Sequence, residues 1–372
     1  MSNRYIKGDG SNIYPETVFP HMGLFGRKKD GGPVLREMVA NLHWDLEDPF
    51  IFASHHFDLY PKGNERQAPP KEEIEKKDLG NDYHGLFGYR LYTSKLTPGF
   101  QLHSHWGYET VTYVPQGYVD HFDSLGNQGR YGYGDMQWIT AGGLYSHCEM
   151  YPLAHQDREN PQLVTQIMIN LPLSEKNTPP EVHTVWKEDL QEFEEDGCTF
   201  TLLAGSFRGR TARIPSQRSW AADPSHHVLI LRVLMGPGAT LRLGPTDAKH
   251  RNIYITDCRA TVAGKEYHED TRLKLRPEAS VEIAMGEKES ELWVLEGDPI
   301  GERQSRWGPV VLGTDSEVRE ANNVIRRKEG PEWQWEYVNQ KQPLGTERFY
   351  RSADGAESRP TGKNPGEPEF DR

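Results

Sequence analysis

Cysteine is scarce in this chain. Only Cys148, Cys198 and Cys258 occur among 372 residues, and no two of them have the spacing of a CxxC motif. Disulfide frameworks and zinc clusters need several cysteines at short, regular spacings. The sequence therefore predicts neither, and a reducing cytoplasm is the expected setting.

An excess of positive charge is also missing, as are long hydrophobic runs. The formal net charge is −12, so no global positive field attracts phosphate backbones, and direct nucleic-acid binding is not expected. Residues 1–30 contain no continuous apolar segment of the kind found in signal peptides. Because no later span approaches the roughly 20 apolar residues of a membrane helix, we expect neither export nor a membrane partner.

Glycine, proline and aromatic side chains are abundant instead. The chain has 36 Gly, 26 Pro and 10% aromatic residues, which is typical of a turn-rich fold with charged loops. From Gly99 to Leu171, β-branched and aromatic segments alternate with glycine-bearing turns, and a similar alternation continues in the second half. This pattern predicts an all-β fold with two antiparallel barrels in tandem.

Changes in composition suggest where these barrels begin and end. We interpret residues 61–82, a charged stretch with three prolines, as an exposed excursion and a candidate mobile flap. We expect an N-terminal extension at 1–45, a first barrel at 46–196, a second barrel at 197–313, and a C-terminal helix and tail at 314–372.

One segment near the end of the chain is predicted to be helical. Thr314 and Glu317 form a capping box, and Val318, Ala321 and Ile325 follow at helical spacing. The polar tail ends in about fifteen residues that we expect to be disordered.

Two pairs of metal-capable side chains stand out in the first predicted barrel. His103 and His105 form one pair, and His147 and Glu149 form the other, each with one residue between its members. In a strand, residues i and i+2 project from the same face, whereas on a helix they do not. The spacing therefore predicts one metal ion inside a β-barrel, held by three imidazoles and one carboxylate.

This set of ligands suits Fe(II), and also Mn, Co, Ni, Cu or Zn. A divalent ion with four protein ligands can keep positions open for substrate and dioxygen. Lewis acidity and substrate templating are the roles that we expect for it.

A second carboxylate competes with Glu149 as the fourth ligand. Glu109 stands four residues after His105 and, by counting along one strand, shares the face of His103 and His105. Five acceptable ligands are more than most such sites use, so we predict that Glu149 is the ligand. Glu109 is then a hydrogen-bond partner that orients an imidazole.

Other candidates are weaker. Cys148 should face away from the metal as a small packed residue, with a redox-sensing thiol as the alternative. His55 and His56 are adjacent, so a strand sends them to opposite faces, in core or surface roles. His121, close to the sequence DSLGN, is interpreted as a turn residue. In the second barrel, Arg242 stands where the first histidine of a repeated motif is expected.

Several motifs around these residues resemble one family. The segments are DPFIFASHHFD, HSHWGYETVTYV, DSLGNQGRYGYGDMQWITAG, SHCEM, INLPLSEKNTPP and, near the end, GPVVLGTDSEV. In order and spacing they are similar to those of the pirins, which are bicupin proteins of the cupin superfamily. The resemblance covers roughly residues 46–330 and is specific in the first barrel and loose in the second.

The resemblance implies one iron in the first barrel, with His103, His105, His147 and Glu149 as its ligands, and a second barrel without metal. Some pirins are similar to quercetin 2,3-dioxygenases, which open a flavonol ring with dioxygen. An animal pirin acts as a nuclear, iron-redox-dependent transcription cofactor. Family membership alone does not choose between these functions.

The preferred hypothesis is a mononuclear iron dioxygenase acting on a flavonol-like or other enolisable small molecule, with Glu149 or Glu109 taking the hydroxyl proton. The alternative is a non-enzymatic, redox-responsive iron protein that acts through a protein partner. The chain departs from the family pattern at Trp106, Gly143 and Met168, so its substrate preference can differ.

Overall fold

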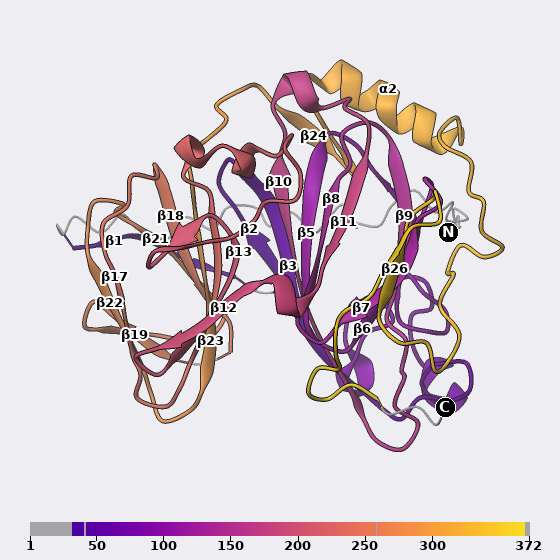
Figure 1. The fold of residues 1–372 in the computed structure, drawn as a ribbon, viewed down its shortest axis with the longest axis horizontal. Coiled ribbons are helices and arrows are strands. Elements are labelled where there is room, and N and C mark those ends of the chain that lie inside the picture. Colours follow the sequence, from indigo (N-terminus) through magenta and orange to yellow (C-terminus); the bar gives the residue numbers. More distant parts are fainter. Residues whose placement is uncertain (1–31, 41, 258, 369–372) are drawn as a thin grey trace, which may run out of the picture.

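The computed structural model describes residues 32–40, 42–257 and 259–368. Two β-barrels lie side by side, and one helix crosses the top of the first barrel (Figure 1). The predicted all-β fold with a short C-terminal helix is confirmed. Expectations about residues 1–31 and the last four residues lie outside the described part of the chain.

The first barrel consists of two six-stranded antiparallel sheets that face each other. The strands of one sheet are, in spatial order, β11 (Glu181–Val185), β8 (Asp135–Thr140), β5 (Tyr108–Gln116), β10 (Asn160–Asn170), β3 (Phe50–Tyr60) and β2 (His43–Asp45). Those of the other are β27 (Glu357–Ser358), β26 (Phe349–Arg351), β7 (Gln128–Gly132), β6 (Tyr118–Asp123), β9 (Tyr145–Met150) and β4 (Gly99–His105).

The second barrel has a seven-stranded and a four-stranded sheet. The larger sheet contains β1 (Val34–Val39), β21 (Thr271–Leu275), β18 (His250–Ile255), β23 (Ser290–Gly297), β16 (Leu229–Met235), β13 (Cys198–Ala204) and β12 (Gln191–Glu195). The smaller sheet contains β17 (Thr240–Leu243), β22 (Val281–Met285), β19 (Ala260–Val262) and β20 (Lys265–Tyr267).

Apolar side chains fill the interior of the second barrel. Phe200, Leu231 and Ile253 are fully buried in one hydrophobic cluster there. Arg242 on β17 is exposed and forms an ion pair with Glu282, so it does not enter the interior. The interior of the second barrel is therefore apolar.

The remaining elements are short. They are the hairpins β14 (Ser206–Phe207) with β15 (Arg210–Thr211) and β24 (Ser305–Trp307) with β25 (Val310–Leu312), helices α1 (Lys71–Ile74) and α2 (Asp315–Arg326), and the 3₁₀ turns η2 (Leu86–Gly88), η3 (Leu173–Glu175), η4 (Lys187–Asp189), η5 (Trp220–Ala222) and η6 (Pro224–His226). The Thr314 hydroxyl caps α2 by accepting from the Glu317 amide. Among the described residues, no helix has the length and apolar character needed to cross a membrane.

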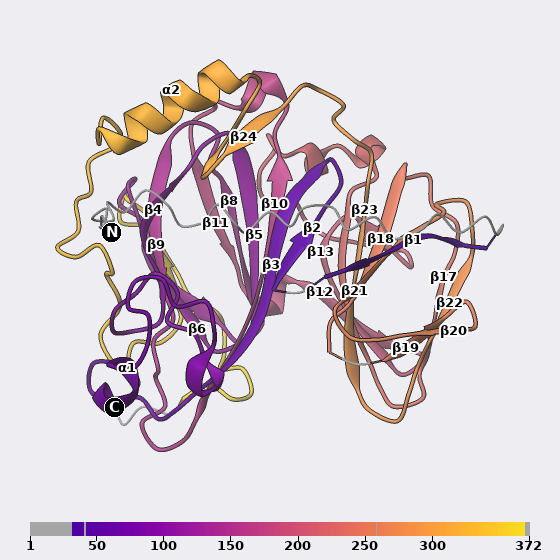
Figure 2. The same ribbon diagram turned by 180° about the vertical axis from the view of Figure 1, so that it is seen from behind.

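Strand pairing does not follow the boundaries expected from composition. β1, within the expected N-terminal extension, pairs with β21 of the second barrel (Figure 2), and β12 also joins that barrel. β26, from the expected tail, pairs with β7 of the first barrel. The pairings of β1 with β21 and of β26 with β7 join strands that are distant in sequence, which local composition does not report.

The segment at residues 61–82 packs against the barrel, unlike the mobile flap suggested by its composition. It includes α1, and the side chains of Ala68 and Ile74 are buried against Leu153 and its neighbours. Lys77 is buried as well, and its ammonium group donates to the carbonyl oxygens of Leu86 and Tyr89. Buried donors and apolar anchors therefore fix this segment.

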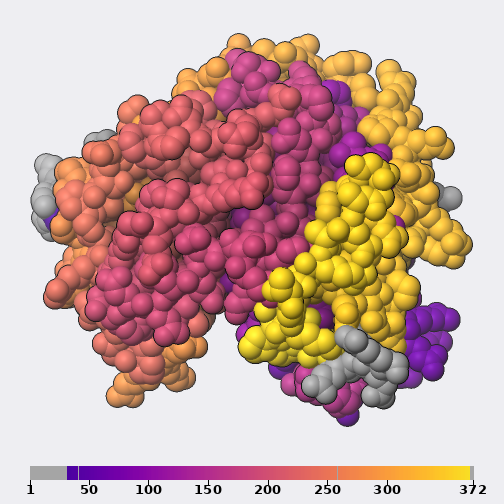
Figure 3. Space-filling view, viewed as in Figure 1, coloured from indigo at the N-terminus to yellow at the C-terminus, as the bar shows by residue number. Residues whose placement is uncertain are grey.

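The described part of the C-terminal tail packs against the first barrel, and this includes some of the last fifteen residues, for which we expected disorder. Figure 3 shows it in yellow as a continuous band over the first barrel. The Leu102 amide donates to the Val338 carbonyl at 2.6 Å, and the Trp335 indole donates to the Asp123 carbonyl at 2.8 Å. Near the end of the described chain, Glu367 is buried and lies 2.9 Å from the Arg348 guanidinium.

A buried lysine ties three segments together beneath α2. The Lys176 ammonium donates to the carbonyls of Gly107 and Val311 and to the Asn170 side chain, at 2.7–3.0 Å. We expect Lys176→Met to lower the free energy of unfolding by more than about 2 kcal/mol, because three buried acceptors lose their donor. Urea denaturation measures this, with the exposed Lys71→Met as control. Equal stability of both variants would contradict the assignment.

Candidate metal centre

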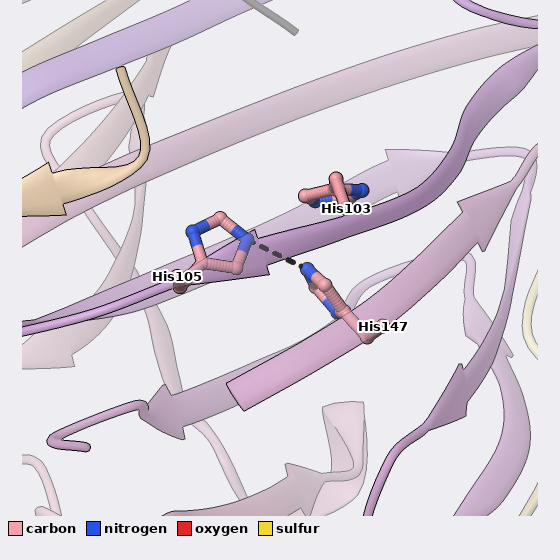
Figure 4. Close-up of side chains that lie close together, drawn as sticks. All are labelled: His103, His105 and His147. Carbon is pink, nitrogen blue, oxygen red and sulfur yellow. Dashed lines mark hydrogen bonds between the residues drawn. The ribbon is translucent and has the colours of Figure 1, made fainter. Parts of the chain in front are cut away.

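The metal-capable histidines come from two adjacent antiparallel strands. His103 on β4 lies directly opposite His147 on β9, and His105 follows on the same face (Figure 4). Ser104 and Ser146 point the other way, and their hydroxyl oxygens are 2.9 Å apart. The alternation of strand side chains thus brings three imidazoles together inside the first barrel.

The ring nitrogens of the three histidines converge. One nitrogen from each ring lies within 4.8 Å of the others, and all three residues are buried. The Nε2 atoms of His105 and His147 are 2.8 Å apart. Glu149 reaches the same place, with Oε2 3.7 Å from His103 Nε2 and 3.6 Å from His147 Nε2.

The other ring nitrogens of His103 and His105 have partners that orient the rings. His103 Nδ1 lies 2.8 Å from the Gln101 carbonyl, which can only accept, so this nitrogen carries the proton. His105 Nδ1 contacts the Tyr108 hydroxyl. Such outer contacts fix the tautomer and the direction of a metal-binding imidazole.

His147 is oriented by His121, whose role the sequence did not suggest. The interpretation of His121 as a turn residue is wrong, because it lies in β6, fully buried, opposite Glu149. Its Nε2 is 3.2 Å from the Asp123 carboxylate and therefore donates to it, while its Nδ1 lies 3.4 Å from His147 Nδ1. His147 then donates from Nδ1 and keeps a lone pair on Nε2.

The electrostatics of the cluster suit a cation. Burial lowers the pKa of His103 to about 4 and the pKa values of His105 and His147 well below their usual range, so the rings are neutral at pH 7. Burial raises the pKa of Glu149 to about 6, which leaves a carboxylate at pH 7. Lone pairs of His103 and His147 and this carboxylate converge on one place inside the barrel. A divalent ion fits that set of acceptors.

Glu149 is itself held in place by β10. The Gln166 side-chain amide donates to both carboxylate oxygens, at 3.1 and 3.2 Å, and to the Thr112 hydroxyl at 3.0 Å. This amide fixes the carboxylate plane while leaving oxygen lone pairs for a metal or a proton.

A cavity opens beside His103 and Glu149. Its other walls come from β2, β3, β10 and the segment before β4, and they are rich in rings. They are formed by Leu42, His43, Ser54, His56, Tyr83, Tyr92, Phe100, Tyr151, Val164 and Gln166. The metal-capable cluster therefore borders a space with aromatic and polar walls.

Glu109 does not share the face of His103 and His105. The chain turns at Trp106 and Gly107, so the alternation of faces restarts in β5. Glu109 accepts hydrogen bonds from the Trp138 indole at 3.0 Å and the Thr140 hydroxyl at 2.6 Å. It therefore points toward the second barrel, whereas Tyr108 faces the histidines.

The position of Glu109 predicts a pH-dependent effect on stability. Burial raises its pKa to about 7 in the folded protein, from an ordinary value of 4.5, against hydrogen bonds from Ser219, Thr140 and Trp138. Below pH 4.5 both states hold the proton. Between pH 4.5 and 7 the unfolded chain loses this proton while the folded protein keeps it. The free energy of unfolding therefore falls by about 3 kcal/mol over this range.

Glu109→Gln keeps an acceptor for Trp138 and Thr140 but cannot ionise. In urea denaturation at pH 8, we expect the variant to be more stable than the wild type. The difference in free energy of unfolding between variant and wild type should shift in favour of the variant by up to about 3 kcal/mol from pH 5 to pH 8. Metal content should be unchanged. The same substitution at the exposed Glu282 should show no such trend. A difference that stays constant between pH 5 and 8 would refute the assignment.

The contact between His121 and His147 carries its own prediction. His121→Phe keeps the ring volume but removes the acceptor for His147 Nδ1. We expect metal affinity, measured by chelator competition, to fall by roughly 10–100-fold. His155→Phe, at a buried histidine that contacts Tyr133 and Gly366, serves as control. Equal affinities of the two variants would show that His121 does not orient His147.

Cys148 and two departures from the family pattern have packing roles. Cys148 faces away from the cluster, donates to the Gln340 carbonyl, and burial raises the pKa of its thiol far above the usual range. These observations favour the packed residue over the redox thiol. Trp106 packs near α2 and donates to Asn177, and Met168 packs with Tyr108, the contact of His105.

Two family models match the chain. A model described as pirin matches residues 35–168, and one described as the pirin C-terminal cupin domain matches residues 230–329. Together they cover strands of both barrels.

Individual relatives agree with these matches. A pirin-like protein of Arabidopsis thaliana is 27% identical, over 60% of this chain and 72% of its own length. A Thermoplasma acidophilum protein, named as a candidate quercetin 2,3-dioxygenase, is 24% identical over 63% and 95%, respectively. A crystal structure of quercetin 2,3-dioxygenase from Acinetobacter baumannii has a TM-score of 0.62 at 20% identity. That match covers 80% of this chain and 97% of the other, and at this identity it shows a shared fold.

The motifs around the histidines, the tandem barrels and the two family models agree with one another. The chain belongs to the pirin family of the cupin superfamily.

Proposed function

We propose that this protein is a mononuclear metal-dependent dioxygenase. Its substrate is a flavonol-like, quercetin-type compound or another enolisable oxygenated small molecule, and Fe(II) is its metal. The observation that carries the proposal is the convergence of His103, His105, His147 and Glu149 beside a cavity with aromatic walls. The name of the Thermoplasma relative supports the same substrate class.

The proposed ligands are the three imidazoles and Glu149. This set suits Fe(II), and Mn, Co, Ni, Cu or Zn are the alternatives. A bound ion would supply Lewis acidity and a template for neighbouring hydroxyl and carbonyl oxygens of the substrate. The neutral imidazoles leave Glu149 as the one charged ligand, so the loaded site keeps a net charge of about +1.

Glu149 is also the proposed proton acceptor for the substrate hydroxyl. Its carboxylate borders the cavity, and the Gln166 amide holds it in a fixed plane. General-base catalysis by a positioned carboxylate contributes roughly 10²–10⁴-fold. We do not propose this role for Glu109, whose hydrogen bonds go to Trp138 and Thr140.

The cavity walls are rich in aromatic rings. Tyr83, Tyr92, Phe100 and Tyr151 present rings around the space, and Phe100 packs 4.8 Å from Tyr92 between ring centroids. Flat apolar faces of this kind bind planar ligands through stacked or edge-to-face contacts. A few polar groups among them then set the orientation of the ligand.

We also propose a reducing compartment, the cytoplasm, as the setting. Cys148 and Cys198 are both free and buried. A reduced metal and reduced thiols are maintained together in such a compartment.

Elemental analysis and oxygen uptake test the proposal. The purified protein should contain close to one divalent ion per chain, and oxygen consumption with quercetin or with an enolisable compound from a small panel should require that ion. Removing the metal with a chelator should stop oxygen uptake, and reloading with Fe(II) should restore it. Folded protein that refuses every metal would refute the proposal.

One result would shift the conclusion to the alternative function. Stoichiometric metal without oxygen uptake on any substrate would favour a redox-responsive regulator that acts through a protein partner. Comparing the surface of the oxidised and reduced protein by hydrogen exchange would then be the next measurement.

A further inference from the structure

Two histidines on the cavity wall, His43 and His56, have no role in the proposed metal site. His56 lies on β3, opposite Val164 of β10, and lines the cavity that His103 and Glu149 also border. Its neighbour His55 points to the other face, where Nδ1 contacts the Thr165 hydroxyl. A histidine beside several aromatic rings in this wall needs a physical explanation.

His56 stands at the end of a buried hydrogen-bond network that starts at Arg90. Asp58 Oδ1 accepts from the Arg90 amide and from its guanidinium, both at 2.9 Å. Asp58 Oδ2 accepts from the Tyr92 hydroxyl at 2.6 Å. The carboxylate is fully buried, so these donors hold its position.

The network fixes which nitrogen of His56 carries the proton. The single hydroxyl proton of Tyr92 goes to Asp58, so Tyr92 can only accept from His56 Nδ1, which lies 2.7 Å away. Asp58 Oδ2 lies 3.4 Å from the same nitrogen and also favours a proton there. With its one proton on Nδ1, a neutral His56 ring has a lone pair on Nε2.

Within the described chain, His56 Nε2 has no hydrogen-bond partner. The ring borders the cavity, and the network behind it makes the imidazole a better acceptor, because Nδ1 donates toward a carboxylate. Ring contacts run from His56 to Tyr92 (4.9 Å between centroids), from Tyr92 to Phe100 (4.8 Å) and from Phe100 to His103 (6.2 Å). His56 and the metal-capable cluster thus occupy different parts of one aromatic wall.

We propose that His56 Nε2 accepts a hydrogen bond from a phenolic hydroxyl of the substrate, while other substrate oxygens reach the metal. This inference rests on the proposed function for its substrate class. It makes His56 a specificity-determining residue that favours polyhydroxylated aromatic compounds over analogues without the second hydroxyl. A site with a preformed acceptor discriminates in this way because the analogue leaves the acceptor unpaired.

The tautomer of His56 can be tested without any substrate. Long-range ¹H–¹⁵N correlation spectra of histidine-labelled protein, loaded with diamagnetic Zn(II), should show His56 protonated on Nδ1 and not on Nε2 at pH 7.5. The spectrum of His56→Gln identifies the signal. A proton on Nε2 in the wild type would overturn the assignment of an acceptor, whatever reaction the protein catalyses.

Ligand binding tests whether His56 Nε2 accepts a hydrogen bond from a ligand hydroxyl. Quercetin and 3-hydroxyflavone share the chelating hydroxyl and carbonyl oxygens, but only quercetin carries further hydroxyls. Under anaerobic conditions the Zn(II)-loaded wild type should bind quercetin roughly tenfold more tightly, the value of one good hydrogen bond. His56→Phe should lose that preference and keep its metal and its affinity for 3-hydroxyflavone.

Two further variants separate this role from a structural one. His56→Gln restores an acceptor and should regain part of the preference. His55→Gln, one residue away on the opposite face of β3, should behave as the wild type. If His56→Phe keeps the full preference for quercetin, the proposal for His56 is wrong although the proposed function stands. If neither flavonol binds the loaded wild type, both the proposal for His56 and the flavonol substrate class are wrong. Oxygen uptake with the wider panel of compounds then shows whether the protein is a dioxygenase for another substrate.

Discussion

His105→Ala should leave a folded protein that no longer holds its metal ion. The Nε2 of His105 lies 2.8 Å from that of His147, at the centre of the cluster. Alanine has no side-chain atom that can bind a metal in its place. Loss of a residue that only orients a ligand weakens metal binding by roughly 10–100-fold. Loss of a ligand itself should therefore exceed about 100-fold, and oxygen uptake should disappear with the metal.

Elemental analysis after gel filtration, with far-ultraviolet circular dichroism as a check of folding, measures this effect. His183→Ala is the matched control, because His183 also lies on a strand of the first barrel but is partly exposed beside Glu181. The control should retain about one ion per chain. A metal content that is the same in both variants would show that the histidine cluster is not the metal site.

The residues of this cluster were predictable from the sequence because their geometry is local. Side chains two residues apart in a strand share a face, so His103 and His105 had to point together, as did His147 and Glu149. Only the pairing of β4 with β9 was then needed to bring the two pairs together. The glycine-rich turns and alternating segments around them predicted the β-barrel for the same reason.

Glu109 shows that counting positions along the sequence does not always identify the face on which a side chain lies. The count from His105 to Glu109 assumes one continuous strand, yet Gly107 has φ +87° and breaks it. A Cβ at this glycine would lie 2.0 Å from the Val311 carbonyl oxygen, so the turn depends on glycine and on a segment two hundred residues later. The alternation of side chains in the strand before such a turn does not predict the faces of the side chains after it.

Long-range strand pairing explains the other differences. His121 became part of the site because β6 pairs with β9, and the tail is ordered because β26 pairs with β7. Neither pairing leaves a local signal, since a strand next to a turn and a polar tail look alike in composition whether or not they find a partner. The role of His56 depends in the same way on Asp58 and Tyr92 meeting across separate segments.

Glu149→Gln should separate metal binding from proton transfer. The amide keeps the shape of the side chain, and three imidazoles remain, so at saturating Fe(II) the variant should still bind metal, with reduced affinity. It cannot accept the substrate proton as a carboxylate does. We expect kcat in oxygen uptake to fall by roughly 10²–10⁴-fold, the usual contribution of a positioned general base.

Glu109→Gln is the matched control, since it makes the same change at a buried carboxyl in the same barrel that hydrogen bonds to Trp138 and Thr140. It should keep both metal and turnover. Turnover of Glu149→Gln within a few-fold of the wild type would exclude Glu149 as the base. Equal losses of turnover in both variants would mean that each substitution lowers activity by disturbing the fold. A loss confined to Glu149→Gln, with metal present, is the result that a carboxylate held by Gln166 at the edge of the cavity should produce.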